Sequence, residues 1–259
     1  MFAHLTKTID RILHGEITHS ETGKNTGIGL AIRDLALLIL ILGGLSGLGI
    51  GSYSALRTLF IDEESNGWAL MQSISSGLKI PLLFLTTLFV TMPSLYVFNA
   101  LAGSHLKIDT VLRLLMSMMT VTLVVMCSLV PIIMFFSLST PNYYFIKLLT
   151  VAACMLGGIL GLFFMRRTLK DLKRRETTKI TSQEISQETL EDITRELKQY
   201  VPRMIFGTWI LAFALVGMQM SWLMRPFIGR AGEEFSWFRA PESNFFINVV
   251  RSIGKTFGA

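Results

Sequence analysis

Three residues inside long apolar stretches are the ones whose types could do chemistry within a membrane. Pro93 and Pro131 each lack an amide hydrogen, free the carbonyl four residues earlier (Phe89 and Cys127) and should kink a helix. Asn99 adds a side-chain amide near the first kink. Kinked helices with uncovered carbonyls can line a substrate or ion path. They also occur in passive bundles, where Ser and Thr side chains satisfy the backbone again. Both interpretations, a pathway and a simple kink, stay open.

Arrangements typical of catalysis or metal binding are missing from the sequence. It contains no Ser–His pairing, no His–Glu–His cluster, no paired carboxylates and no Walker-type loop. Ionisable residues usually mark the working positions of membrane spans. Here Asp34, Arg57, Arg113 and Lys147 lie near the ends of apolar stretches, from where their side chains can reach outward. The sequence therefore predicts no enzyme, no metal site and no cofactor.

Five long apolar stretches are the elements that must position these residues. The chain is 51% hydrophobic and 16% charged, with a mean hydropathy of +0.53. Each stretch is close to the ~20 residues that a helix needs to cross a bilayer. The stretches are Leu35–Ser54, Ile80–Leu101, Leu114–Phe136, Phe145–Met165 and Met204–Trp222. We expect an all-α, polytopic transmembrane bundle of about five spanning helices, with amphipathic interfacial helices at both ends.

This pattern divides the chain into five regions. Residues 1–34 form a cytoplasmic amphipathic arm, and residues 35–165 form the first four spans. Residues 166–203 are a basic cytoplasmic loop with an amphipathic helix. The fifth span covers residues 204–224, and an aromatic-rich interfacial tail covers residues 225–259.

Orientation follows from the distribution of Lys and Arg, which are retained on the cytoplasmic side of short loops. The strongest cluster follows the fourth span: Arg166, Arg167, Lys170, Lys173, Arg174 and Arg175. This cytoplasmic anchor places the N-terminus inside. The loop after the first span then lies outside, with Arg57 and Lys79 at its margins.

The tail fits this orientation less well, because it carries five cations and should lie outside. Either its arginines meet lipid phosphates along the outer membrane face, or one span is miscounted. We favour the first alternative, since the charge rule is weakest far from span ends.

Amphipathic patterns lie outside the five stretches. Near the start, Phe2, Leu5, Ile9, Ile12 and Leu13 recur at helical spacing. Such a stripe suits the membrane surface, a partner groove or the protein's own bundle. The segment from Thr181 to Tyr200 has a broken apolar face, for partner docking or for packing on the bundle. In the tail, one helix face carries Phe246, Val249, Val250, Ile253 and Phe257.

Glycines at intervals of four form smooth helix faces in two spans. They are Gly43, Gly47 and Gly51 in the first span and Gly157 and Gly161 in the fourth. Such faces let another backbone approach closely. The partner is either another helix of the same chain or a second protein.

The remaining composition adds few constraints. The net charge of +6 comes mostly from residues beside the spans, where they meet anionic headgroups, so we expect no nucleic-acid partner. The two cysteines, Cys127 and Cys154, lie within apolar stretches and read as small buried hydrophobes.

Three short motifs carry a resemblance to known proteins. They are GLKIP at Gly77–Pro81, PSLYVFN at Pro93–Asn99 and SWLMRPFIG at Ser221–Gly229. With five spans and a cytoplasmic N-terminus, residues 35–230 resemble the Yip-type integral membrane proteins and uncharacterised bacterial multi-span proteins. The resemblance implies a five-span fold in a bacterial inner membrane. The tyrosine-containing signature of the eukaryotic members has no counterpart here, so neither trafficking roles nor site residues carry over.

Two functional hypotheses follow. The first is a non-catalytic scaffold or accessory subunit that assembles with other membrane proteins or with itself in a bilayer with anionic headgroups. It rests on the glycine faces and the amphipathic arms. The second is a channel or transporter component for a neutral or weakly polar solute, and it rests on Pro93, Asn99 and Pro131.

Overall fold

The computed structural model describes residues 2–13, 31–60, 68–101, 108–140, 142–181, 210–229, 235–238 and 245–257. Every regular element in these ranges is an α-helix. The helices are α1 (Phe2–Leu13), α2 (Ile32–Gly51), α3 (Tyr53–Phe60), α4 (Trp68–Leu101), α5 (Ile108–Ser139), α6 (Tyr143–Thr181), the helix Ile210–Leu223, and α8 (Phe245–Phe257). The prediction of an all-α helical bundle is confirmed.

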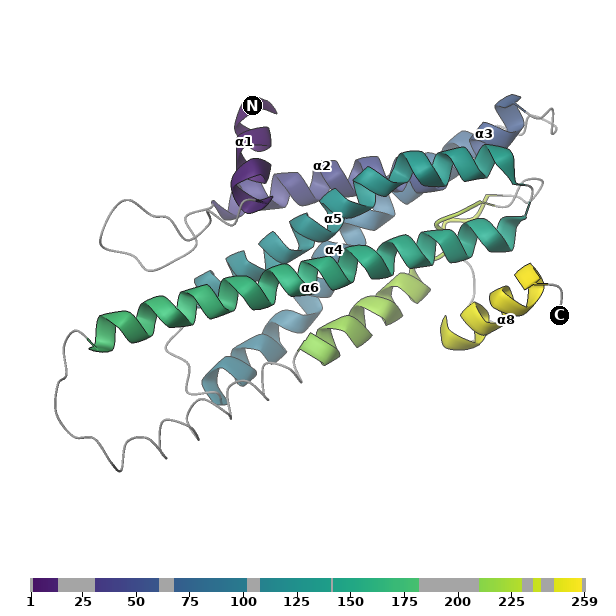
Figure 1. The fold of residues 1–259 in the computed structure, drawn as a ribbon. Helices are drawn as coiled ribbons and strands as arrows, with labels where there is room; N and C mark the ends of the chain where they lie inside the picture. Colours follow the sequence, from purple (N-terminus) through teal and green to yellow (C-terminus); the bar gives the residue numbers. More distant parts are fainter. Residues whose placement is uncertain are drawn as a thin grey trace.

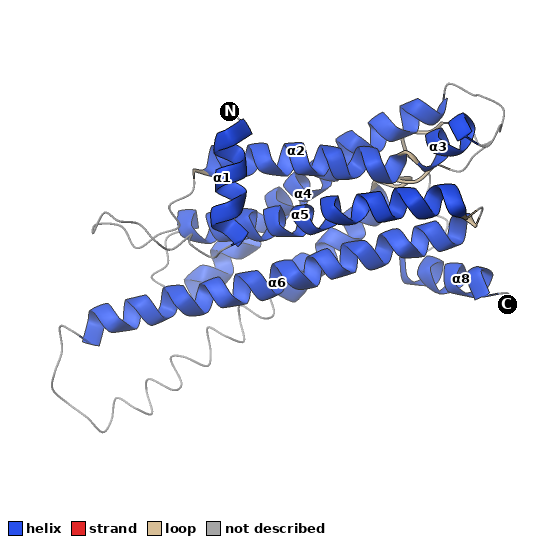
Figure 2. Ribbon diagram, turned by 45° about the horizontal axis from the view of Figure 1, so that its top comes forward, coloured by secondary structure: helices blue, strands red, loops and turns tan. Residues whose placement is uncertain are grey.

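The long helices α2, α4, α5 and α6 run lengthwise along the molecule, and consecutive ones point in opposite directions (Figures 1 and 2). Helix α2 packs on α4 and α5, and α5 packs on α6. One end of the bundle, the α1 end, holds α1 and the end of α6 (Figure 1). The opposite end, the α3 end, holds α3, the turn between α5 and α6, and α8 (Figure 1).

Four of the described helices are long and apolar enough to cross a membrane. The candidate spans are Ile32–Gly51, Leu70–Ser94, Asp109–Ser139 and Tyr143–Thr168. The fifth predicted span is represented by the shorter apolar helix Ile210–Leu223, and residues 204–209 lie outside the described ranges. This architecture fits an integral membrane protein.

Helices α4, α5 and α6 are longer than their apolar stretches, α4 and α6 by the most. Helix α4 begins at Trp68 rather than near Ile80, because its first turns carry a polar face that packs inside the protein. Helix α6 has 39 residues and continues to Thr181, past the predicted end at Met165. At 1.5 Å per residue it is about 58 Å long, well beyond the ~30 Å hydrocarbon core. The predicted basic loop therefore begins as a helix.

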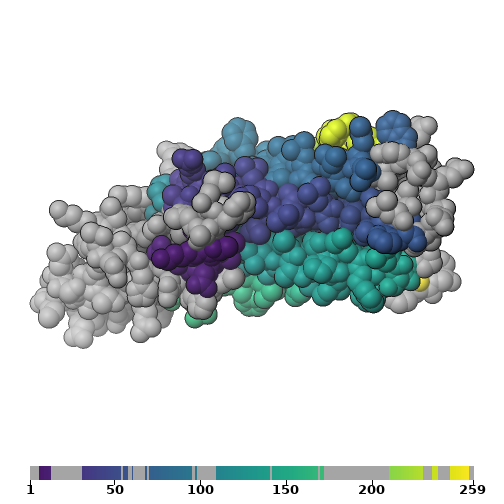
Figure 3. All heavy atoms as spheres, turned by 90° about the horizontal axis from the view of Figure 1, so that it is seen from above, coloured from purple at the N-terminus to yellow at the C-terminus, as the bar shows by residue number. Residues whose placement is uncertain are grey.

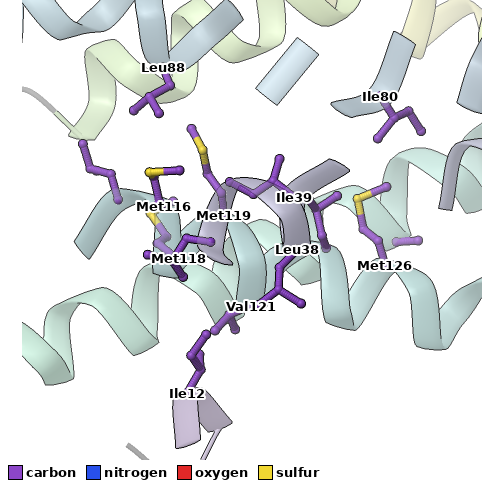
Figure 4. Close-up of a cluster of buried hydrophobic side chains, with 14 of the residues drawn as sticks. Ile12, Leu38, Ile39, Ile80, Leu88, Met116, Met118, Met119, Val121 and Met126 are labelled. Carbon is purple, nitrogen blue, oxygen red and sulfur yellow. The ribbon is translucent and has the colours of Figure 1, made fainter. Parts of the chain in front are cut away.

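The core lies where α2 packs against α4 and α5. Seen from above, α2 lies between these two helices (Figure 3). Figure 4 shows the buried cluster, to which α2 contributes Leu38 and Ile39 and α5 contributes Met119 and Met126. Ile12 of α1 joins this cluster, and α1 contacts both α2 and α5.

Large apolar side chains also cover the outside of the bundle. On α4 these include Leu78 and Phe89, and on α6 they include Met155 and Phe163. Phe89 is 78% exposed. Soluble monomers rarely expose such continuous apolar surface, whereas a membrane protein presents it to lipid or to a partner helix.

Candidate functional site

A polar stripe runs along one face of α4 near the α3 end of the bundle. Gln72, Ser76 and Lys79 follow one another at intervals of four and three residues, so they share a face of the helix. All three side chains are buried, and Lys79 is 3% exposed. The stripe lies within the candidate span Leu70–Ser94. Lys79 is therefore a buried cation inside a predicted membrane helix.

The stripe holds the segment that follows the helix Ile210–Leu223. We call residues 224–229 and 235–238 the C-terminal segment. Gln72 Nε2 donates to the carbonyl oxygen of Pro226 at 3.1 Å, and Ser76 Oγ donates to that of Phe227. Lys79 Nζ donates to the carbonyl oxygen of Pro226 at 3.1 Å and to that of Trp237. The carbonyl groups of non-helical backbone need such donors wherever water does not reach them.

Lys79 meets neutral dipoles and an aromatic ring. Its ammonium group lies 5.2 Å from the centroid of the Phe238 ring, a distance at which the ring quadrupole attracts a cation. Within the described residues, its hydrogen bonds go to backbone carbonyls. These contacts hold a peptide backbone in place, and they bring no nucleophile to a general base.

The sequence predicts Lys79 at the margin of a loop and ionisable residues only near span ends. Both statements are wrong for Lys79, which lies inside the α4 span. The predicted apolar stretch begins directly after it, at Ile80. The signal that would have found it is the helical spacing of Gln72, Ser76 and Lys79, which marks a polar helix face continuing into the apolar stretch.

A second group of contacts closes the α3 end. Arg57 of α3 is buried, with its guanidinium 5.9 Å from the centre of the Tyr53 ring and 3.5 Å from the Thr140 carbonyl oxygen. Tyr143 donates its hydroxyl hydrogen to the Ile228 carbonyl oxygen at 3.3 Å. Arg57 therefore packs against the turn between α5 and α6 instead of reaching outward.

Helix α8 packs its polar side against the start of α6. Lys147 Nζ donates to Asn248 Oδ1, and Lys255 Nζ donates to the Tyr144 hydroxyl at 3.1 Å. Ser252, one turn after Asn248, is 1% exposed. The opposite face of α8 carries exposed apolar side chains: Phe246, Ile247, Val250 and Ile253. In the predicted apolar face Val249 is half-buried, and the side chain of Phe257 lies outside the description.

The predicted glycine faces lie between helices of this chain. A Cβ atom on Gly43 would lie 3.1 Å from Pro81 Cα, and one on Gly51 would lie 2.8 Å from Ser76 Cβ. Gly47 meets the same part of α4, where its Cβ would lie 2.7 Å from Gly77 Cα.

On α6, a Cβ on Gly157 would lie 3.0 Å from the Thr122 carbonyl oxygen of α5. One on Gly161 would lie 3.1 Å from the Met118 carbonyl oxygen. In the structure all five glycines serve packing within the chain, α2 against α4 and α6 against α5.

The predicted pathway residues are not brought together. Pro93 lies in the half of α4 toward the α1 end, and Pro131 lies in the half of α5 toward the α3 end. Both prolines are exposed, and each helix continues through its proline. Near Pro93, Thr91 Oγ1 donates to the Thr87 carbonyl oxygen at 2.8 Å. The side chain of Asn99 lies outside the description.

The predicted cytoplasmic anchor lies at the α1 end of α6. The side chains of Arg166, Arg167 and Lys170 are exposed there. Those of Lys173, Arg174 and Arg175 lie outside the description, as do residues 182–200 and the acidic loop after α3. Cys127 and Cys154 are free thiols. In the part of the chain that the structure describes, no three His, Cys, Asp or Glu residues gather as a metal site would require.

Comparison with known proteins adds no relative to this geometry. The chain matches no protein-family model, no curated protein and no solved structure. The resemblance to Yip-type proteins therefore stays a prediction.

Proposed function

We propose that this protein is a non-catalytic integral membrane scaffold or accessory subunit that assembles with other membrane proteins or with itself. The main support for the proposal is what the buried cation Lys79 binds. Lys79 and the polar side chains beside it bind the chain's own backbone, at Pro226 and Trp237. A polar site that is occupied by its own chain supports a structural role.

The outer surface supplies the second support. Exposed Leu78 and Phe89 of α4, and exposed Met155 and Phe163 of α6, offer apolar faces to lipid and to the helices of a partner. A scaffold needs such faces and needs no reactive centre.

The membrane and orientation that we propose are a bacterial cytoplasmic membrane with the α1 end inside. Exposed Arg166, Arg167 and Lys170 support this orientation, because cations next to spans are retained in the cytoplasm and attract anionic headgroups. The α3 end, with α8, then lies at the outer face. A reporter enzyme that is active only outside, fused after Ala259, should be active; activity confined to a cytoplasmic reporter would contradict the orientation.

Site-specific photo-crosslinking in native membranes tests the scaffold role. A photoreactive phenylalanine in place of Phe163, which is exposed on α6, should yield a protein adduct of one reproducible mass. The matched control replaces Met165, two residues away and fully buried, and should yield no such adduct. Adducts of lipid alone from Phe163, Leu78 and Phe89 would contradict the proposal.

The channel hypothesis is tested in the same preparation. Purified protein in liposomes should conduct no neutral solute faster than empty liposomes. Flux that falls in Asn99→Leu and Pro93→Ala would replace the scaffold proposal with the transport one.

A further inference from the structure

We propose that Lys79 is the tethered cation of a carbonyl-lined ammonium site, and that this site fastens the C-terminal segment to α4. The ligand class is a small primary ammonium ion, which the chain supplies from its own side chain. The charge of the group, beyond the packing of its methylene stem, is what holds the segment.

The first support is the set of groups around the ammonium. The carbonyl oxygens of Pro226 and Trp237 accept its hydrogens, and the face of the Phe238 ring lies nearby. Carbonyl dipoles replace the hydration shell of monovalent cations in protein sites, and aromatic faces favour ammonium groups. These three groups come from one short part of the chain and converge on one atom.

The second support is burial. Lys79 is 3% exposed, so little solvent reaches its side chain, and it lies within the candidate span Leu70–Ser94. A buried charge without partners costs several kcal/mol. The C-terminal segment removes that cost by placing its carbonyls on the ammonium, and the ammonium in turn satisfies carbonyls that no helix or sheet pairs. Each side of the contact needs the other.

The third support is that the residues of the polar stripe bind different parts of the C-terminal segment. Gln72 and Ser76, which are neutral, hold the carbonyls of Pro226 and Phe227. Lys79, which is charged, donates to the Trp237 carbonyl. Ring contacts also hold residues 235–238, such as that of Phe235 with Trp68 at 6.4 Å between centroids. Loss of the ammonium should therefore release residues 235–238 first.

A cysteine in place of Ser236 reports on that release. Its hydroxyl oxygen is buried in the structure, so a thiol there should react slowly with a maleimide. The background carries Cys127→Ser and Cys154→Ser, and the protein is measured in liposomes. Lys79→Ala should speed labelling by about tenfold to a hundredfold, since hydrogen bonds to a charged group are lost.

Chemical rescue separates charge from packing. An excess of ethylammonium chloride should restore slow labelling in Lys79→Ala, because the neutral amine crosses the bilayer and its protonated form fits the vacated site. Tetramethylammonium chloride at equal ionic strength should not, because it has no hydrogen to donate. Lys79→Met fills the volume without charge, and it should label fast in both salts. Lys255→Ala, at an exposed lysine of α8, should label as slowly as the parent.

Several results would overturn the proposal. Slow labelling in Lys79→Ala would mean that the lysine does not fasten the segment. Slow labelling in Lys79→Met, or fast labelling in Lys79→Ala that ethylammonium does not reverse, would assign the effect to packing. If Lys79→Ala folds poorly, its folded yield becomes the readout. Recovery of the folded yield in ethylammonium chloride but not in sodium chloride would support the site, and a low yield in both salts would contradict it.

Discussion

The two terminal helices, α1 and α8, turn opposite faces to the same bundle. In α1, Ile12 is buried in the core cluster, while Lys7 and Asp10 are exposed. This is the arrangement of a helix whose outer face meets water. The two helices are similar in length, with 12 and 13 residues, and both have an apolar face and a polar face.

In α8 the arrangement is inverted. Ser252 is buried, Asn248 accepts a hydrogen bond from Lys147 of α6, and Val250 is 68% exposed among other apolar side chains. Such a helix is stable where hydrocarbon covers its outer face. An amphipathic pattern alone therefore does not show whether the outer face of a helix meets water or lipid. The face that packs on the bundle shows it: where the polar face packs inward, as in α8, the apolar face is left outside.

The largest expected effect comes from charging the buried face of α1. Ile12→Asp places a carboxylate in the core cluster, where it has no described partner, and should cost about 3–5 kcal/mol of unfolding free energy or detach α1. Lys7→Ala, on the exposed face of the same helix, should change stability by less than about 0.5 kcal/mol. Denaturant unfolding in detergent measures both, and equal losses would contradict the placement of α1.

A second substitution breaks the polar docking of α8. Asn248→Leu removes the oxygen that Lys147 bonds, and a hydrogen bond to a charged group contributes about 1.5–3 kcal/mol. Labelling of Ser252→Cys, buried in the parent, should speed by about tenfold or more. Accessibility of a Thr8→Cys reporter in α1 should stay unchanged. If Ser252→Cys stays protected, the hydrogen bond between Lys147 and Asn248 is not what holds α8.

Glycine substitutions test whether α8 depends on the seating of α6. In Gly161→Ala the new Cβ would overlap Thr122 Oγ1 and lie 3.1 Å from the Met118 carbonyl oxygen, so Thr122 must move or α6 must shift against α5, at a cost of about 1–3 kcal/mol. Gly158→Ala is the matched control, because nothing lies within 4 Å of its Cβ. We expect Gly161→Ala alone to lower the thermal midpoint and loosen α8. Equal effects of the two variants would contradict the packing described for α6.

The smallest expected effect concerns the cations at the margin of α8. Arg251→Ala removes an exposed side chain whose charge can reach the headgroups beside the apolar face. Stability in detergent should change by less than about 0.5 kcal/mol. A soluble α8 peptide that carries the change should bind anionic liposomes somewhat more weakly, as measured by flotation. An unchanged affinity would mean that Arg251 does not contact the headgroups.

Much of the fold could be predicted from the sequence because lipid imposes one simple pattern. Long apolar stretches predicted the helices α2, α4, α5 and α6. The start of α4 could not be placed, since Ser76 and Lys79 belong to a face that packs on protein rather than on lipid. Apolarity marks the parts of a helix that meet lipid or the apolar core, so it does not mark the first turns of α4, whose polar face binds the chain's own backbone.

The Lys79 site was hidden for a different reason. Its partners are backbone carbonyls of Pro226 and Trp237, far along the chain, and a carbonyl belongs to every residue and leaves no signature. The spacing of Gly43, Gly47 and Gly51 predicted a close helix contact, but it could not name the partner helix. Only the fold shows that α4 is that partner.

The central claim is that lipid, rather than water, covers the apolar face of α8. Tryptophan in place of Val250, with the four native tryptophans replaced by phenylalanine, can be measured in liposomes containing brominated phospholipid. We predict a blue-shifted emission that the bromines quench strongly, whereas a tryptophan in place of Lys7 on α1 should emit as in water and be quenched little. Water-like, unquenched emission at position 250 would contradict this claim. So would a blue shift that arises because a second copy of the protein, rather than lipid, covers this position.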